Sequence, residues 1–124
     1  MSKESLIQQT IISNLSALAV KYNFVFFAPM NEGVMMVLKM FKVPDQTCHR
    51  IIQWLKKMGF LPGVSDIEIV HNGCAYFIEV KNEKGKQSDK QILFMNKVLD
   101  AGCDYAVVRS WGECKYCLKE WGII

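Results

Sequence analysis

The sequence predicts an α/β domain in which helices flank a mixed β-sheet, with the element order α-β-(α-α)-β-β-α-β-α. Segments with helical hydrophobic spacing alternate with short strand-like runs, which is typical of this class. The dipeptide Asn72-Gly73 indicates a hairpin between two of the strands. The chain has 124 residues, 51% hydrophobic and 22% charged, so we expect one globular domain over 1–124, with a helical insertion at 32–58.

The first half of the chain predicts helices around one short strand. Ser2 is positioned to cap the first helix, and Pro29 ends the strand, which is aromatic and β-branched. Asp45 is expected to cap a third helix that ends at Gly59. In order, the expected elements are a helix over 4–22, a strand over 24–28, a helix over 32–43 and a helix over 45–58.

The second half predicts a hairpin, a helix, a further strand and a last helix. Ser88 with Gln91, and Ser110 with Glu113, each have the spacing of a capping box that opens a helix. In order, the expected elements are strands over 66–71 and 74–81, a helix from 88 to about 101, a strand over 105–109, and a helix from 110 through 121.

Composition excludes several classes of protein. No apolar run approaches the ~18 residues that a membrane span requires. The polar segment 1–9 has no apolar core or cleavage site of a secretory signal, and the five cysteines form an odd set without a disulfide framework. We therefore expect a protein with reduced thiols that works inside a cell, without a membrane or a small-molecule cofactor.

The net charge is only +3, but the basic residues are concentrated in two segments, 39–57 and 81–97, where few acids balance them. Such segments are suited to binding a polyanion around a more acidic middle of the chain. The alternative is that they are ordinary solvated lysines. The candidate DNA-contacting residues are Lys39, Lys42, Arg50, Lys56, Lys57, Lys84, Lys86 and Lys90.

The hairpin register brings three charged residues together. A two-residue turn at Asn72-Gly73 places Asp66 directly opposite Glu79, with Cβ atoms about 5 Å apart, and Lys81 shares their face of the sheet. At that separation two carboxylates repel by roughly 3 kcal/mol in an effective dielectric of about 20. A hard divalent cation between them would relieve this repulsion. The alternatives are a surface charge cluster, or a three-residue loop that turns Asp66 to the other face.

Five fragments of the chain, in order, resemble the PD-(D/E)XK nuclease core and, more closely, the virus-type replication-repair nuclease (VRR-NUC) family. The resemblance covers nearly the whole chain, and it departs at Ser65, where the family commonly has proline. The fragments are Glu4-x-x-Ile7-Gln8, Met58-Gly59-x-x-Pro62-Gly63-Val64-Ser65-Asp66, Phe77-Ile78-Glu79-Val80-Lys81, Gly85-Lys86-Gln87-Ser88-x-x-Gln91, and Gly102 through Val107-Val108-Arg109-Ser110.

The resemblance implies a restriction-endonuclease-like fold and a metal-dependent phosphodiesterase. Asp66 and Glu79 would bind Mg²⁺ or Mn²⁺, with the backbone carbonyl of Val80 as a further ligand, and Lys81 would be the catalytic lysine. Two further residues match the family's site. Glu4 matches a helix glutamate that approaches the metal directly or through water, and Gln91 matches a glutamine beside the site. Each also has a structural explanation: Glu4 lies in the first turn of a helix, where its charge favours the helix dipole, and Gln91 is the capping-box partner of Ser88.

The implied substrate is DNA, branched as in a four-way (Holliday) junction; the alternatives are flaps, duplex DNA, or a DNA-binding module of this fold that does not cleave. The helix expected over 32–43 is apolar around much of its surface, which favours a symmetric homodimer, unless that helix is buried in the monomer core or under a loop. Stand-alone viral members of the family are dimers associated with junction resolution. This implies the cytoplasm of a bacterial or phage-infected cell.

Other candidate sites are weaker. Cys114-x-x-Cys117 lies inside an expected helix without a second such pair, so buried core cysteines are a better interpretation than zinc. His49 and His71 stand apart from any nucleophile. Glu68 shares the face of the proposed metal site, but we favour a solvated strand position.

Overall fold

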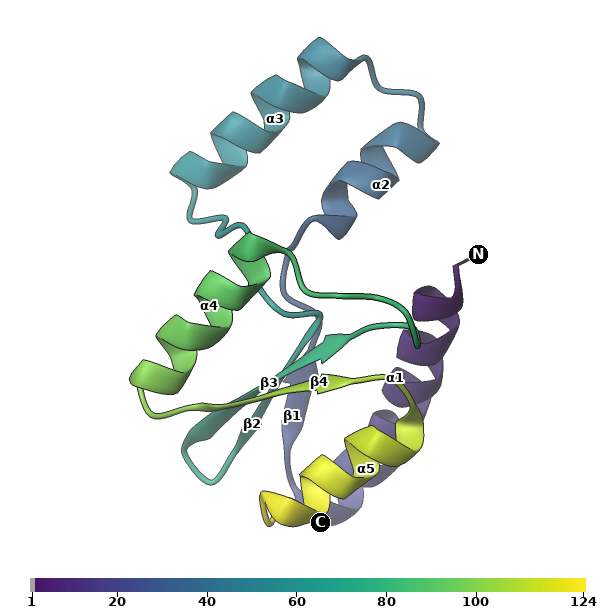
Figure 1. Ribbon diagram of the computed structural model, residues 1–124, viewed down its shortest axis with the longest axis vertical. Coiled ribbons are helices and arrows are strands. Elements are labelled where there is room, and N and C mark those ends of the chain that lie inside the picture. Colours follow the sequence, from purple (N-terminus) through teal and green to yellow (C-terminus); the bar gives the residue numbers. More distant parts are fainter. Residues whose placement is uncertain (1) are drawn as a thin grey trace.

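The chain folds into a mixed sheet with helices on both faces and a helical pair that projects beyond one end (Figure 1). The computed structural model describes residues 2–124. The α/β class, consistent with a restriction-endonuclease-like fold, and the predicted element order are confirmed. The elements are α1 (Lys3–Tyr22), β1 (Val25–Phe27), α2 (Gly33–Met40), α3 (Asp45–Lys57), β2 (Ile67–His71), β3 (Cys74–Val80), α4 (Asp89–Asp100), β4 (Asp104–Val108) and α5 (Trp111–Glu120).

The sheet has the strand order β1-β2-β3-β4. The first two pairings are antiparallel, and β4 runs parallel to β3 because α4 carries the chain back across the sheet. His71 pairs with Cys74, and both turn residues have positive φ, 49° at Asn72 and 75° at Gly73. The hairpin therefore has the two-residue turn and the register that the sequence predicts.

The two faces of the sheet have different partners. Alternate residues such as Ile67, Ile69 and Ile78 point to one face and are fully buried in a core with Ile11 of α1 and Leu118 of α5. On the opposite face α4 covers part of the sheet, where the ring of Phe94 packs edge-on against Phe77 at 5.3 Å and also contacts Tyr105. Because residues alternate along a strand, Glu79 belongs to this second face.

The pair α2–α3, which we call the helical arm (residues 33–57), stands clear of the sheet in Figure 1. Among the described residues of the arm, α2 has none that is buried and α3 has only Cys48. Exposed apolar side chains remain at Met36, Met40 and Phe41. The alternative that the first arm helix is buried in the monomer is therefore wrong. That 32–58 is an insertion remains a prediction.

Two of the four predicted helix caps differ from the structure. Ser2 and Ser88 cap α1 and α4 as predicted. Asp45 does not cap α3, because it is already the first helical residue, where its charge favours the helix dipole; Pro44 precedes it without a side-chain cap. Ser110 accepts a hydrogen bond from the Glu113 amide, but the Glu113 carboxylate binds the Arg109 amide, so this capping box is incomplete. Within residues 2–124, no helix combines the length and apolar character needed to cross a membrane.

Candidate active site

Asp66, Glu79 and Lys81 meet at the end of the β2–β3 hairpin. Asp66 lies just before β2, and its Oδ2 accepts a hydrogen bond from the Val80 amide at 2.8 Å. The Lys81 ammonium lies 3.4 Å from Oε2 of Glu79, with only 11% of the Lys81 side chain exposed. The hairpin register thus brings together the three residues that the sequence predicts to converge.

Glu79 is the most unusual group of this cluster. It is 1% exposed, and among residues 2–124 its Oε1 has no hydrogen-bond partner. The pKa of Glu79 is raised to about 8, mainly by burial and then by the neighbouring Asp66 carboxyl, while Lys81 acts in the opposite direction. Burial, and then the charge of Glu79, also raise the pKa of Tyr105. A buried carboxylate oxygen without a partner is suited to accept a cation.

The donor atoms around Glu79 fit one kind of metal. Within residues 2–124 no three His, Cys, Asp or Glu side chains gather closely enough to hold an ion by themselves. Two carboxylates supplemented by a backbone carbonyl and water form an all-oxygen donor set, which is the kind that hard divalent cations prefer. Cys114 is instead a fully buried core residue whose thiol pKa is raised to about 12, mainly by burial. Its interpretation as a core cysteine is confirmed.

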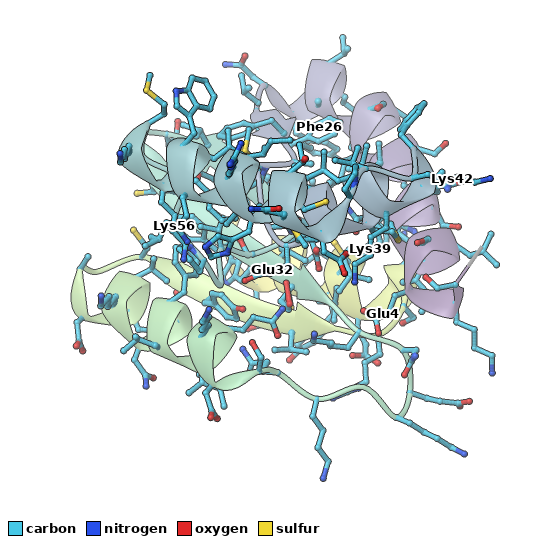
Figure 2. All side chains as sticks on the ribbon, turned by 90° about the horizontal axis from the view of Figure 1, so that it is seen from above. Glu4, Phe26, Glu32, Lys39, Lys42 and Lys56 are labelled. Atoms are coloured by element: carbon cyan, nitrogen blue, oxygen red, sulfur yellow. The ribbon has the colours of Figure 1, made fainter. Side chains whose placement is uncertain are left out.

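Glu4 and Gln91 line a cavity of about 620 Å³ together with Asp66. Glu4 extends from α1 (Figure 2), and a Cβ built on Gly85 would lie 3.3 Å from its Oε2 and 3.3 Å from Cδ of Lys81. Glycine therefore lets the loop after β3 approach both side chains. Gln91 accepts a hydrogen bond from the Ser88 amide at 2.9 Å, so its capping role is confirmed. Catalytic roles for Glu4 and Gln91 remain predictions.

The predicted DNA-contacting residues separate into two groups. Lys39, Lys56 and Lys90 line a cavity of about 580 Å³ between the arm and α4, and Figure 2 shows Lys39 and Lys56 on either side of Glu32. Lys86 lines a neighbouring cavity of about 550 Å³ with Lys81 and Lys90. The remaining residues lie on the exposed surface, and Lys42 points outward in Figure 2; they are Lys42, Arg50, Lys57 and Lys84. Glu68 is half-buried opposite Phe77 and not fully solvated.

Sequence reasoning assigned no role to three residues that support the site. The Asn31 side-chain amide donates to Oδ1 of Asp66 at 3.0 Å, and Oε1 of Glu32 accepts from the Gly63 amide at 2.7 Å. Arg109 donates through one nitrogen, Nη1, to the carbonyls of Asn82 and Gly85, which anchors the loop after β3. Asn two residues before Gly33 is a local turn signal, but nothing in the sequence connects Asn31 with Asp66.

A family model described as the VRR-NUC domain matches residues 2–111. This match covers most of the 124-residue chain, so the chain belongs to the VRR-NUC family, a family of nucleases. No match to a curated protein or to a solved structure is found.

Proposed function

We propose that this VRR-NUC chain is a divalent-metal-dependent endonuclease that hydrolyses phosphodiester bonds in DNA. The observation that carries the proposal is the buried carboxylate of Glu79, which lies beside Asp66 and Lys81 and whose Oε1 has no partner among residues 2–124. Burial of an ionisable group next to a like charge costs stability. Such arrangements are typical of functional sites.

Asp66 and Glu79 would hold Mg²⁺ or Mn²⁺, with the Val80 carbonyl as a further ligand. When bound, the ion polarises a phosphoryl oxygen and makes water a better nucleophile. The amide of Val80 already fixes one oxygen of Asp66, at 2.8 Å. The strand that supplies two ligands therefore also orients the third.

Lys81 supplies a fixed positive charge where charge develops on the phosphate. Its ammonium is held 3.4 Å from Glu79 and largely shielded from solvent, so its field is weakly screened. From this position it orients the attacking water or stabilises the negative charge at phosphorus. Glu4 of α1 and Gln91 of α4 line the same cavity, and they would assist through water and through hydrogen bonds to the substrate.

The lysines around the site would bind the phosphate backbone. Lys39 and Lys56 on the arm face Lys90 on α4 across one cavity, and Lys86 extends this basic surface toward Lys81. Lys42, Arg50, Lys57 and Lys84 would contact more distant phosphates. Contacts of this kind carry little sequence information, so the chain would select DNA by structure.

The proposed substrate is branched DNA such as a four-way junction, cut by a homodimer. Exposed apolar residues of the arm, including Met40 and Phe41, provide a surface for a second copy. A two-fold dimer would present two sites, which suits paired incisions. Flaps and linear duplexes are the competing substrates. A binding module without cleavage is disfavoured because Asp66, Glu79 and Lys81 are all present.

Incubation of the purified chain with labelled four-way junction, flap and linear duplex, in Mn²⁺, Mg²⁺ or EDTA, tests the proposal. We expect cleavage only with metal, and fastest on the junction. Asp66→Ala and Glu79→Ala should abolish both cleavage and calorimetric Mn²⁺ binding. Lys81→Ala should bind metal and DNA but cleave at least ~100-fold more slowly. Glu83→Ala, at an exposed residue that pairs with Lys3, is the control. Near-normal turnover by Lys81→Ala would falsify the mechanism.

A further inference from the structure

We propose that Asn31 is a positioning residue that orients Asp66 and couples the helical arm to the metal site. The inference rests on the proposed function, because it assigns Asp66 to metal binding. It adds a residue outside the carboxylate–lysine cluster, and it gives the arm a role besides contacting DNA. The observations that support it are hydrogen bonds at the base of the arm.

Asp66 is held from two sides. Its Oδ2 accepts from the backbone of β3 at Val80, and its Oδ1 accepts from the side chain of Asn31, at 2.8 and 3.0 Å. One donor on each oxygen fixes the plane of the carboxylate. Each carboxylate oxygen has a second lone pair, which stays available for a cation. Removal of the Asn31 donor would leave the plane of Asp66 free to turn about the remaining bond.

Asn31 is itself fixed by the start of the arm. Its Oδ1 accepts from the Gly33 amide at 2.9 Å, which closes a turn directly before α2. A Cβ on Gly33 would lie 3.0 Å from that oxygen, closer than side chains normally approach. Both ends of the Asn31 amide are therefore occupied, one by the first residue of α2 and the other by Asp66. The position of α2 sets the position of the donor.

A second contact ties the two ends of the arm together. Glu32, just before α2, accepts from the amide of Gly63 at 2.7 Å, and Gly63 lies in the loop that leads from α3 to Asp66. Gly63 in turn packs against the carbonyl of Lys90 on α4. Movement of the arm relative to α4 must therefore act on these bonds and, through Asn31, on Asp66.

DNA supplies a force on the arm. Lys39 and Lys56 of the arm line the same cavity as Lys90 of α4, together with Glu32 and Asp45, so a phosphate backbone that contacts the lysines of both parts would draw the arm and α4 together. Phosphate contacts on both the arm and α4 would hold the arm in the position in which Asn31 donates to Asp66. DNA binding should therefore raise the affinity of the site for metal, and metal should raise the affinity for DNA by the same factor.

Mn²⁺ titrations, followed by calorimetry and by the electron paramagnetic resonance signal of free Mn²⁺, test this coupling. Asn31→Ser keeps an oxygen that can accept from the Gly33 amide but cannot reach Asp66. We expect its Kd for Mn²⁺ to rise about tenfold or more, with the melting temperature in EDTA lowered only by the loss of one hydrogen bond. Asn14→Ser removes the side-chain amide of a half-buried α1 residue, which donates to the Thr10 carbonyl, and should leave the Kd for Mn²⁺ unchanged.

The titrations are repeated with a linear duplex, with each variant carrying Lys81→Ala to prevent cleavage. DNA should lower the Kd for Mn²⁺ with Asn31 in place, and Asn31→Ser should reduce this effect at least threefold. Gly33→Ala, which crowds the Asn31 side chain and leaves Asp66 intact, should shift Mn²⁺ affinity in the same direction by less. This variant keeps the test decisive if Asn31→Ser lowers the melting temperature.

Three results would overturn the inference. Equal Mn²⁺ affinity of Asn31→Ser and the unsubstituted chain would show that Asn31 does not orient Asp66. An unchanged effect of DNA on Mn²⁺ affinity in Asn31→Ser would show that the arm is not coupled to the site through this residue. Failure of the unsubstituted chain to bind Mn²⁺ would instead refute the proposed function, and this inference with it.

Discussion

Glu79 shows how one residue can be unfavourable for the fold and useful for the site. The strand that carries it is buried from Tyr76 to Val80 and has no other charged residue, so an aliphatic side chain at this position would favour stability. The carboxylate is retained with Oε1 unpartnered among residues 2–124, and with Lys81 as the nearest cation. Lys81 offsets only part of the cost, since the pKa of Glu79 still rises to about 8. The remaining cost is what a bound cation would relieve.

This imbalance predicts a pH dependence of stability in metal-free conditions. In EDTA, folded Glu79 holds its proton up to about pH 8, whereas the unfolded chain loses it near the ordinary glutamate pKa of 4.5. The unfolded state then binds fewer protons, so stability conferred by the protonated carboxyl falls as pH rises from about 4.5 to about 8. The melting temperature of the metal-free chain should fall across this window, and Glu79→Gln should lessen the fall.

Circular dichroism melts between pH 5 and 8.5 in EDTA provide the measurement. The neighbouring groups that face Glu79 are Asp66, Lys81 and Tyr105, so each is left unchanged in the comparison. Glu83→Gln, at an exposed glutamate, is the control and should follow the unsubstituted chain. Parallel pH profiles for Glu79→Gln and the unsubstituted chain would contradict the protonation of this carboxyl.

At the scale of elements, the sequence predicts the features that depend on residues close together in the chain, such as turns and strand register. The turn at Asn72-Gly73 sets the β2–β3 register, and that register alone brings Asp66 to Glu79. Element ends are less predictable: α2 ends at Met40 and not at residue 43, with Lys42 at a φ of 57° in the turn that follows. The Asn31–Asp66 bond joins residues 35 apart, and neither periodicity nor turn chemistry carries a signal for such a contact.

Gly63 is the element-scale position where we predict the largest loss of stability. Its φ of +88° is unfavourable for residues with a Cβ, and an added Cβ would collide with the Lys90 carbonyl of α4. Gly63→Ala should therefore lower the free energy of unfolding by about 3 kcal/mol, the sum of a backbone cost of ~1–2 kcal/mol and steric displacement of a helix start.

Urea unfolding of Gly63→Ala and Gly73→Ala separates the two contributions. Gly73 also has positive φ, 75°, but nothing lies within 4 Å of its added Cβ. Gly73→Ala should thus show only the backbone cost, about 1 kcal/mol. Equal losses in both variants would mean that the loop bearing Asp66 does not pack tightly on α4.

At the scale of the whole molecule, the site lies where three parts converge. In Figure 1 the α1 side of the sheet, the start of α4 and the base of the arm meet at one end of the fold. The cavity walls confirm this, since Glu4, Asp66, Gln91 and Asn31 line one hollow from four different segments. The core lies on the other side of the sheet, against α1 and α5. The arm can therefore move relative to the site without disturbing the packing of the core.

The arm also carries the final prediction, that two copies associate through it. Met40 is 71% exposed and Phe41 77% exposed, next to further apolar side chains of α2. Apolar surface gathered on a projecting helix pair favours a two-fold contact, in which the same patch meets itself.

Light scattering at assay concentrations should give a dimer, and Met40→Glu should convert it to a monomer that still binds Mn²⁺. Val20→Glu, at an apolar α1 residue that is 89% exposed and away from the arm, should remain dimeric. If the unsubstituted chain is monomeric, or prefers a flap to a four-way junction, paired incision by a dimer is wrong and the nuclease site is unaffected. If Val20→Glu dissociates as readily as Met40→Glu, the contact does not lie on the arm.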